Sequence, residues 1–168
     1  GLGRIGSRVA HHAVKGFDIK VVYTDVKQNA EFEQEFGAKF ATSIDELLPQ
    51  CDFVSLHVPL LSSTHHLINE ERLKKMIKTA YLINTSRGPV IDEKALALSL
   101  SKGEIQGAAI DVFEFEPEIT KSLKKLDNII LTPHIASATR ETRDKMAILA
   151  AENIIAALSG QTPPNLIK

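Results

Sequence analysis

Apolar stretches typical of buried strands alternate with helical patterns along the chain, and this alternation restricts the possible folds more than any other feature. The expected strands are 19–23, 52–58, 80–84, 105–112 and 128–131, and the expected helices are 5–14, 30–36, 44–48, 69–76, 92–102 and 139–159. The stretch 52–58 is apolar apart from Ser55, which is typical of a strand buried on both faces of a parallel sheet. The alternation predicts an α/β fold with a doubly wound parallel sheet.

Capping residues predict where several of these helices begin and end. Gly16, Gly37 and Gly103 follow helical patterns, and glycine readily takes the left-handed conformation that ends many helices. Ser43 and Glu46 have the spacing of a capping box, which predicts a helix beginning after Ser43.

Length and composition restrict the class of protein. A chain of 168 residues is long enough for one domain with a sizeable core. Its 20 basic and 21 acidic residues give a net charge of -1, which argues against a nucleic-acid partner. No apolar run approaches the ~18 residues that a membrane span requires. The one cysteine, Cys51, is expected to be a buried structural thiol, and with no signal peptide the expected location is the cytoplasm.

The chain opens with the run GLGRIG, which matches a dinucleotide-binding fingerprint. In such a run Gly1 makes a tight turn, Gly3 lets the backbone approach a pyrophosphate, and Gly6 lets the following helix pack closely. The phosphates then meet the positive end of that helix. The sequence therefore predicts a dinucleotide site at residues 1–6.

The residue expected to bind the adenosine ribose is Asp25. It lies nineteen residues after Gly6, at the end of the expected strand 19–23, where such an acid accepts hydrogen bonds from the ribose. The alternative is that Asp25 merely caps a turn. Because a carboxylate repels a 2'-phosphate, NAD is favoured over NADP, although the nearby Lys27 leaves NADP open.

A fingerprint of this kind normally follows a strand, and no residue stands before Gly1. We therefore expect residues 1–160 to form a dinucleotide-binding domain whose first strand is missing from this chain. That strand belongs at the centre of the sheet, so its absence predicts a gap of about 10 Å, two strand spacings wide.

Three polar residues each follow an expected strand: Arg87, Glu116 and His134. The carboxyl ends of the strands face the ligand crevice in a doubly wound sheet, so these side chains are expected to converge near the cofactor. Arginine holds a carboxylate with a planar fork, histidine transfers a proton near neutral pH, and glutamate orients the imidazole. Each alone could be a structural polar residue, but together they fit the reduction of a 2-oxo acid.

The motifs GLGRIG, YTD, HVPLLSSTHHLIN, INTSRG, AAIDVFEFEP and LTPHIASAT give the chain a clear family resemblance. It resembles the NAD-binding domain of the D-isomer-specific 2-hydroxyacid dehydrogenases. Within that family the motifs are most similar to those of the glyoxylate and hydroxypyruvate reductases, followed closely by those of the phosphoglycerate dehydrogenases. Glu116 argues against the related formate dehydrogenases, in which a glutamine accompanies the histidine.

The resemblance implies a role for each matching residue. Arg87 would bind the substrate carboxylate, His134 would be the acid/base, and Glu116 would be its partner. Asp111 would bind the nicotinamide carboxamide, and Pro59 and Thr64 would lie along the ribose and phosphates. The full expected cofactor-binding set is Gly1, Gly3, Arg4, Ile5, Gly6, Asp25, Pro59, Thr64, Thr85 and Asp111, and no residue is assigned to a metal.

The resemblance also implies a second domain and a partner. Family members have a separate substrate domain, and residues 161–168 would begin the return to it. A homodimer through the cofactor domain and a small 2-oxo or 2-hydroxy acid as substrate are implied. Three alternatives stay open: a phosphoglycerate dehydrogenase-like enzyme, a corepressor-type NAD sensor of the same family, and a domain that only binds NAD.

Overall fold

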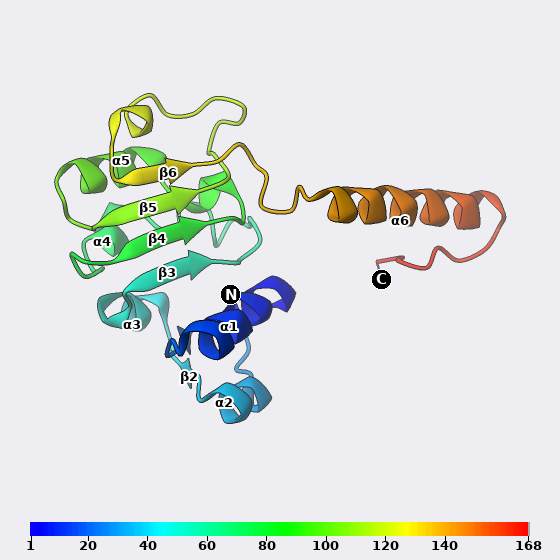
Figure 1. Ribbon diagram of the computed structural model, residues 1–168, viewed down its shortest axis with the longest axis horizontal. Helices are drawn as coiled ribbons and strands as arrows, with labels where there is room; N and C mark the ends of the chain where they lie inside the picture. The colour runs from blue at the N-terminus through cyan, green and yellow to red at the C-terminus, as the bar shows by residue number, and fades with distance from the viewer. Residues whose placement is uncertain (168) are drawn as a thin grey trace. The chain divides into compact units, whose positions relative to one another are not determined.

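The computed structural model describes residues 1–167 and divides the chain into two compact units, Gly1–Pro133 and His134–Lys168 (Figure 1). Within residues 1–167 all strands lie in the first unit, and the second unit contains the long helix α6 (Arg140–Leu158). The predicted domain boundaries, 1–160 and 161–168, stay a prediction.

The strands of the first unit form two parallel sheets. In one, β1 (Val22–Tyr23) pairs with β2 (Lys39–Phe40). The other has four strands in chain order, all parallel (Figure 1): β3 (Phe53–Leu56), β4 (Tyr81–Asn84), β5 (Gly107–Ile110) and β6 (Ile129–Leu131). The predicted parallel α/β architecture is confirmed.

Most helices begin at a side chain that caps the backbone. The helices of the first unit are α1 (Arg4–Phe17), α2 (Ala30–Phe36), α3 (Ile44–Leu47), α4 (Glu70–Leu73) and α5 (Glu93–Ser101), with short 3-10 turns at Leu48–Gln50, Gly88–Val90 and Leu123–Lys125. Side chains that accept a hydrogen bond from the first turn precede α2 to α6: Asn29, Ser43, Asn69, Asp92 and Thr139. The exception is α1, whose N-cap is Gly3 and has no side-chain hydrogen bond.

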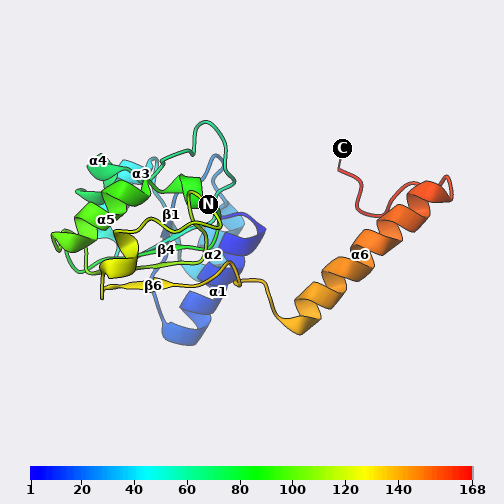
Figure 2. The same ribbon diagram turned by 90° about the horizontal axis from the view of Figure 1, so that it is seen from above.

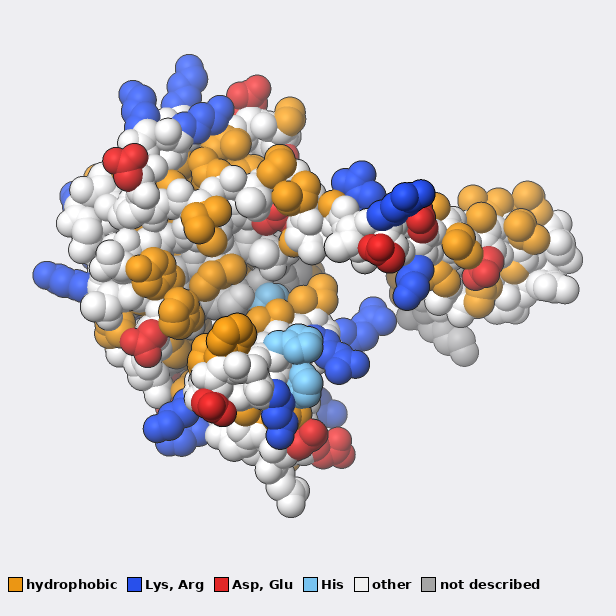
Figure 3. All heavy atoms as spheres, viewed as in Figure 1, with side chains coloured by type: hydrophobic (Ala, Val, Ile, Leu, Met, Phe, Trp, Pro, Cys, Tyr) orange, Lys and Arg blue, Asp and Glu red, His pale blue; other side chains and the backbone are white. Residues whose placement is uncertain are grey.

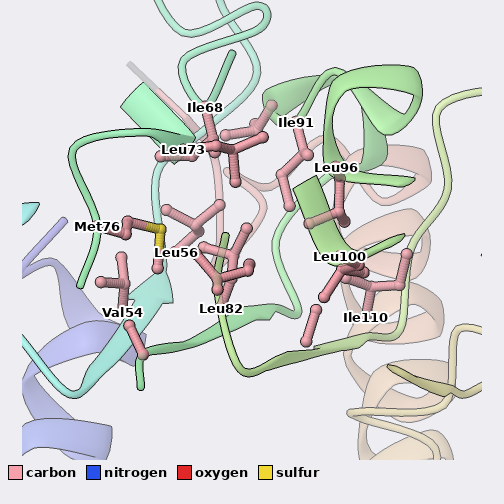
Figure 4. Packing of buried hydrophobic residues seen from close by; sticks show 14 of the residues in the cluster. Val54, Leu56, Ile68, Leu73, Met76, Leu82, Ile91, Leu96, Leu100 and Ile110 are labelled. Carbon is pink, nitrogen blue, oxygen red and sulfur yellow. The ribbon is translucent and has the colours of Figure 1, made fainter. Parts of the chain in front are cut away.

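The main core lies between the four-stranded sheet and the helices on one of its faces (Figures 2 and 4). Helices α3, α4 and α5 lie on this side of the sheet in Figure 2. The core side chains labelled in Figure 4 include Val54, Leu56, Leu82 and Ile110 from the strands and Leu73, Leu96 and Leu100 from the helices. A smaller cluster of Ala10, Tyr23, Phe32 and Ala38 packs α1 and α2 around β1.

The expectation that 52–58 is buried on both faces is wrong. Along β3 the side chains alternate between exposed and buried: Phe53 is 60% exposed, whereas Val54 is 5% exposed. Tyr81 of β4 and Ile130 of β6 are exposed as well, and apolar side chains gather over the strands in Figure 3. The physical reason is that α3 to α5 cover only one face, so alternate side chains of each strand point away from them.

Several predicted element ends shift by a few residues. Helix α1 continues past Gly16, and Asp18 takes the left-handed conformation (φ 54°), which aspartate tolerates better than most residues. Gly37 and Gly103 do take the left-handed conformation, as predicted, with φ of 65° and 64°. The strand expected at 19–23 is shorter, because only Val22–Tyr23 finds a partner, and that partner, β2, has no apolar run by which to predict it.

The two sheets are not paired with each other at the position where the sequence predicts a missing strand, and the predicted width of about 10 Å stays a prediction. No pairing joins β1 to β3 among the described strands. Gly1 lies between Thr24, which follows β1, and His57, which follows β3. Its amino group donates to the Thr24 carbonyl oxygen (2.7 Å). A Cβ on Gly1 would lie 2.8 Å from the His57 carbonyl carbon. Within residues 1–167 no helix is long and apolar enough to cross a membrane.

Candidate functional site

The glycine loop, residues 1–6, has the geometry that its sequence predicts. A Cβ on Gly6 would lie 2.0 Å from the Gly1 carbonyl oxygen, so only glycine allows α1 to begin so close to the turn. At Gly3 no atom lies within 4 Å of the position that a Cβ would take, so this glycine faces open space. Arg4 and Ile5 are exposed in the first turn of α1. Since that helix lacks a side-chain cap, its N-terminus is available to an anion.

Asp25 ties the glycine loop to the end of β1. Its Oδ2 accepts a hydrogen bond from the Leu2 amide (2.6 Å), and its Oδ1 accepts one from the Val26 amide (2.7 Å). The glycine loop and the turn after β1 thus both donate a hydrogen bond to the Asp25 carboxylate. Each carboxylate oxygen has a second lone pair, so a ribose hydroxyl can still bind, and that role stays a prediction.

A partly buried network that no sequence motif indicates fixes the segment after β1. The Tyr23 hydroxyl donates to Glu33 Oε1 (2.7 Å) and accepts from the Asn29 amide (2.6 Å). Burial, followed by the hydrogen bond to Glu33, raises the pKa of Tyr23. The network connects both ends of the segment that carries Asp25 to helix α2. The partners are ten residues apart, so no local motif identifies them.

The loop that contains Pro59 and Thr64 is closed by a single hydroxyl. Thr64 Oγ1 donates to the Pro59 carbonyl oxygen (2.6 Å) and accepts from the Leu61 amide (2.7 Å). The primary effect of Thr64 in this structure is to shape the loop. A direct contact of Pro59 or Thr64 with a cofactor stays a prediction.

The arginine turn, residues 84–88, is held from inside by Asn84, which is 1% exposed. Asn84 Nδ2 donates to the Arg87 carbonyl oxygen (3.0 Å), and Asn84 Oδ1 accepts from the amide and the hydroxyl of Ser86 (3.0 and 2.8 Å). Thr85 and Arg87 are exposed at the surface of the turn, and Arg87 Nη1 donates to the Ser86 carbonyl oxygen (2.7 Å). The buried amide therefore fixes the backbone from which the guanidinium projects.

Gly88 packs the arginine turn against the loop that carries Glu116. A Cβ on Gly88 would lie 1.9 Å from both the carbonyl carbon and the carbonyl oxygen of Phe113. The amide of Phe113 donates to Glu116 Oε1 (2.9 Å). The structure therefore brings the backbone that bears Arg87 into direct contact with the loop that bears Glu116. Asn84 and Gly88 belong to the motif INTSRG, but the sequence predicts no role for either of them.

Asp111 lies beneath these loops at the end of β5. It is 3% exposed, its Oδ1 accepts from the Thr132 hydroxyl (2.6 Å), and its amide donates to the Asn84 carbonyl oxygen (2.9 Å). Asp111 thus ties together the carboxyl ends of β4, β5 and β6. Its expected contact with the nicotinamide carboxamide stays a prediction.

His134 is the first residue of the second unit. Its backbone takes the left-handed conformation (φ 54°), which is uncommon outside glycine and concentrates at functional sites. The first unit brings the arginine turn and the Glu116 loop together, while the approach of His134 to them stays a prediction.

Cys51 is half-buried rather than fully buried, and it packs against the main core. Burial, with the nearby Asp52 charge adding to it, raises the pKa of its thiol. A protonated thiol is a poor nucleophile, which supports the structural role expected of Cys51.

The chain belongs to the D-isomer specific 2-hydroxyacid dehydrogenase family, since residues 1–136 match the model of that family's NAD-binding domain. It is 53% identical over 168 residues to a glyoxylate reductase from Thermofilum pendens, covering 99% of this chain and 49% of that protein. The chain thus spans about half the length of the curated relatives that it matches.

Solved structures agree with this assignment and differ in cofactor. One is a D-isomer specific 2-hydroxyacid dehydrogenase from Lactobacillus delbrueckii ssp. bulgaricus in an NAD-complexed form (TM-score 0.88, 35% identity, 100% of this chain and 54% of that one). Another is an NADPH-dependent glyoxylate/hydroxypyruvate reductase from Sinorhizobium meliloti in complex with NADP and malonate (TM-score 0.88, 33% identity, 95% of this chain and 48% of that one). The fold is therefore that of the family's NAD-binding domain.

Proposed function

We propose that this chain is the cofactor domain of an oxidoreductase that transfers a hydride between a nicotinamide dinucleotide and a short 2-oxo or 2-hydroxy acid. Glyoxylate or hydroxypyruvate is the substrate that we favour, since the chain is 53% identical to a glyoxylate reductase. The observation that carries the proposal is the contact between the arginine turn and the Glu116 loop at Gly88. This contact supports the proposal that Arg87 acts as a carboxylate clamp and that Glu116, from the neighbouring loop, orients a histidine.

The glycine loop fits a dinucleotide on structural grounds. Gly3 faces open space and the N-terminus of α1 has no side-chain cap, so its backbone N–H groups suit a pyrophosphate. When bound there, the cofactor supplies or accepts the hydride. The residues that would hold it are the cofactor-binding set predicted from the sequence, with Asp25 on the ribose side.

The chain's own residues perform the remaining steps of the proposed reaction. Arg87 binds the substrate carboxylate with two hydrogen bonds and fixes the orientation of the carbonyl group. His134 donates a proton to the carbonyl oxygen during reduction and removes it during oxidation. Glu116 accepts from the other ring nitrogen and favours the charged imidazole. The Phe113 amide, in turn, orients Glu116.

We propose NAD rather than NADP as the cofactor. Asp25 projects from the end of β1 with its carboxylate already anchored on two amides, so it cannot easily turn away from an incoming 2'-phosphate. Lys27 is exposed and lies two residues further on, which is the feature that would favour NADP. The ratio of the dissociation constants for NADH and NADPH, measured by fluorescence titration, tests this proposal.

The whole protein is proposed to be a cytoplasmic homodimer that contacts its partner through the cofactor domain. The interruption between β1 and β3 supports a further strand, supplied by a part of the whole protein that this chain does not span. Light scattering of the whole protein tests the dimer.

The decisive experiment follows NADH oxidation by the whole protein with glyoxylate, hydroxypyruvate and pyruvate. We expect turnover with at least one of them, and a loss of about 100-fold or more in kcat for His134→Gln with unchanged NADH affinity. Arg87→Lys should raise KM about 10-fold, because an ammonium cannot replace the planar fork. Background activity on all three acids would reject the enzyme and favour an NAD sensor. A loss of NADH binding in His134→Gln would make that histidine structural.

A further inference from the structure

Two neighbouring histidines stack on each other in the loop before α4. The ring centroids of His65 and His66 lie 4.1 Å apart, with an angle of 28° between the ring planes. Successive side chains of an extended segment point to opposite sides, but His66 takes a left-handed conformation (φ 49°), and both rings lie on the same side. The amide of His66 donates to the Pro89 carbonyl oxygen (2.8 Å), which fixes this backbone.

Glu114 approaches the histidine pair from a loop that is distant in the sequence. Its Oε1 lies 2.8 Å from His66 Nε2, across a separation of 48 residues, and its side chain is 12% exposed. Glu93 holds Glu114 at two points: the Glu93 amide donates to Glu114 Oε2 (3.3 Å), and the Glu114 amide donates to Glu93 Oε1 (2.7 Å). The carboxylate is therefore fixed before any ligand arrives.

The surroundings of Glu114 carry more negative than positive charge. Glu93 is 1% exposed, and its Oε2 is buried without a hydrogen-bond partner. In the described part of the chain no lysine or arginine forms an ion pair with Glu93 or Glu114. Two poorly solvated carboxylates without a lysine or arginine partner are costly unless another cation compensates them. The structure thus offers a place for a positive charge.

Three potential ligand atoms lie close enough together for one metal ion to contact all of them. One nitrogen each of His65 and His66 and one oxygen of Glu114 all lie within 4.8 Å of one another. His65 is exposed and lines an open depression with Leu60, Leu61 and Ser62, so an ion can reach the group from solvent. Two imidazoles and one carboxylate form a ligand set that Zn²⁺ uses with water in the remaining position.

We propose that His65, His66 and Glu114 bind one divalent transition-metal ion of the zinc class, with Glu93 positioning Glu114. On binding, the metal takes the place of the proton in the hydrogen bond between His66 Nε2 and Glu114, and the His66 ring then carries that proton on Nδ1. A small rotation of the exposed His65 ring then brings its nitrogen to the metal as the third protein ligand. The proposed site uses none of the residues assigned to the dehydrogenase reaction and does not rest on the proposed function.

Titration of the metal-free whole protein with Co²⁺ and Zn²⁺ tests the proposal. We expect one Co²⁺ per chain, seen as visible absorption typical of nitrogen and oxygen ligands, and displacement of Co²⁺ by Zn²⁺ but not by Mg²⁺. His65→Ala should weaken binding by at least about 10-fold. Because His65 is exposed, this variant should keep the wild-type fold, which circular dichroism checks. Glu114→Gln should weaken binding as well.

The matched control is the other adjacent pair of histidines, His11 and His12 on α1. Their rings lie 5.1 Å apart in a T-shaped arrangement, and they belong to no group of potential ligands among the described residues. His12→Ala should leave metal binding unchanged. The proposal is overturned if neither metal binds, which would leave an ion pair only. It is also overturned if His65→Ala binds as well as wild type, if His12→Ala loses binding equally, or if Mg²⁺ displaces Co²⁺.

Discussion

The glycine loop and the arginine turn use glycine in the same way, but their backbone polar groups are treated in opposite ways. Gly6 and Gly88 each lie where a Cβ would collide with a backbone atom, at 2.0 and 1.9 Å. In the arginine turn, however, the buried Asn84 side chain satisfies the backbone from inside. In the glycine loop no side chain caps α1 and Gly3 faces open space.

This difference reflects the group that each turn offers to a ligand, a side chain in the arginine turn and backbone N–H groups in the glycine loop. A turn that presents a side chain must have a fixed backbone, so its own polar groups are paired within the turn. A loop that presents its backbone to an anion must leave N–H groups available. The following predictions test this distinction, from the largest expected effect to the smallest.

Gly88→Ala should produce the largest change. The new methyl group would collide with the Phe113 backbone, which belongs to another loop, and we expect a loss of about 3 kcal/mol in the free energy of unfolding. Urea denaturation of the wild type and the variant measures this loss. Gly16→Ala is the control, because no atom lies within 4 Å of that Cβ position and alanine favours a helix. Equal stability of the two variants would contradict the close contact.

Asn84→Ala should cost about 2 kcal/mol of folding free energy, because it leaves buried backbone groups of the arginine turn without partners. If the proposed function holds, KM for the 2-oxo acid should rise more than the NADH dissociation constant. Ser86→Ala removes only one partner of Asn84 and should show a smaller change in the same direction. A variant of Asn84 with normal KM would show that the turn does not position Arg87.

Gly3→Ala should lower the free energy of unfolding by about 1 kcal/mol or less, since the new methyl group meets no atom and only the N-cap preference for glycine over alanine is lost. NADH should nevertheless bind about 10-fold more weakly, because the methyl group stands where the pyrophosphate is expected. Fluorescence titration with NADH and thermal unfolding separate the two effects. An unchanged affinity of the variant for NADH would show that the glycine loop does not present its backbone to the cofactor.

The smallest expected effect is a pH dependence at His57, whose backbone contacts Gly1. Burial lowers the pKa of His57. The folded state therefore binds this proton less readily than the unfolded state. The stability that neutral His57 contributes is present above about pH 6.5, its ordinary value, and is lost as the pH falls below it.

His57→Gln provides the measurement, because glutamine can keep the hydrogen bond to Ser55 Oγ (2.9 Å) but does not titrate. Unfolding free energies of both proteins should converge or cross as the pH falls from about 7.5 to about 5.5. Parallel curves over this range would exclude a contribution of His57 to the pH dependence.

Much of the fold could be predicted, because hydrophobic pattern and capping are local properties. Asp92, Ser43 and Gly37 stand beside the helices that they begin or end, and the apolar strands are contiguous in the sequence. The exposed face of β3 could not be predicted. An apolar side chain such as Phe53 looks the same in a sequence whether or not a helix covers it, and coverage depends on which elements pack beside the strand.

The same division applies to the candidate site. Arg87, Glu116 and Asp25 stand out because each is a polar residue after a strand, and the sequence also predicts the fingerprint of the glycine loop. The contacts that fix the surrounding loops cannot be recognised in the sequence. Gly88 packs against Phe113 and His66 binds Glu114 from different loops, and Tyr23 of β1 binds Glu33 of α2.

The sequence by itself determined the parallel α/β architecture, the glycine loop and the polar residues at strand ends, because periodicity, glycine spacing and chain order are local. Only the tertiary structure decided which of these residues touch. The close approach of Gly88 to Phe113, the burial of Asn84 and the meeting of Glu114 with the histidine pair depend on side-by-side packing of β4 and β5. That packing joins residues that are far apart along the chain, and no local pattern records it.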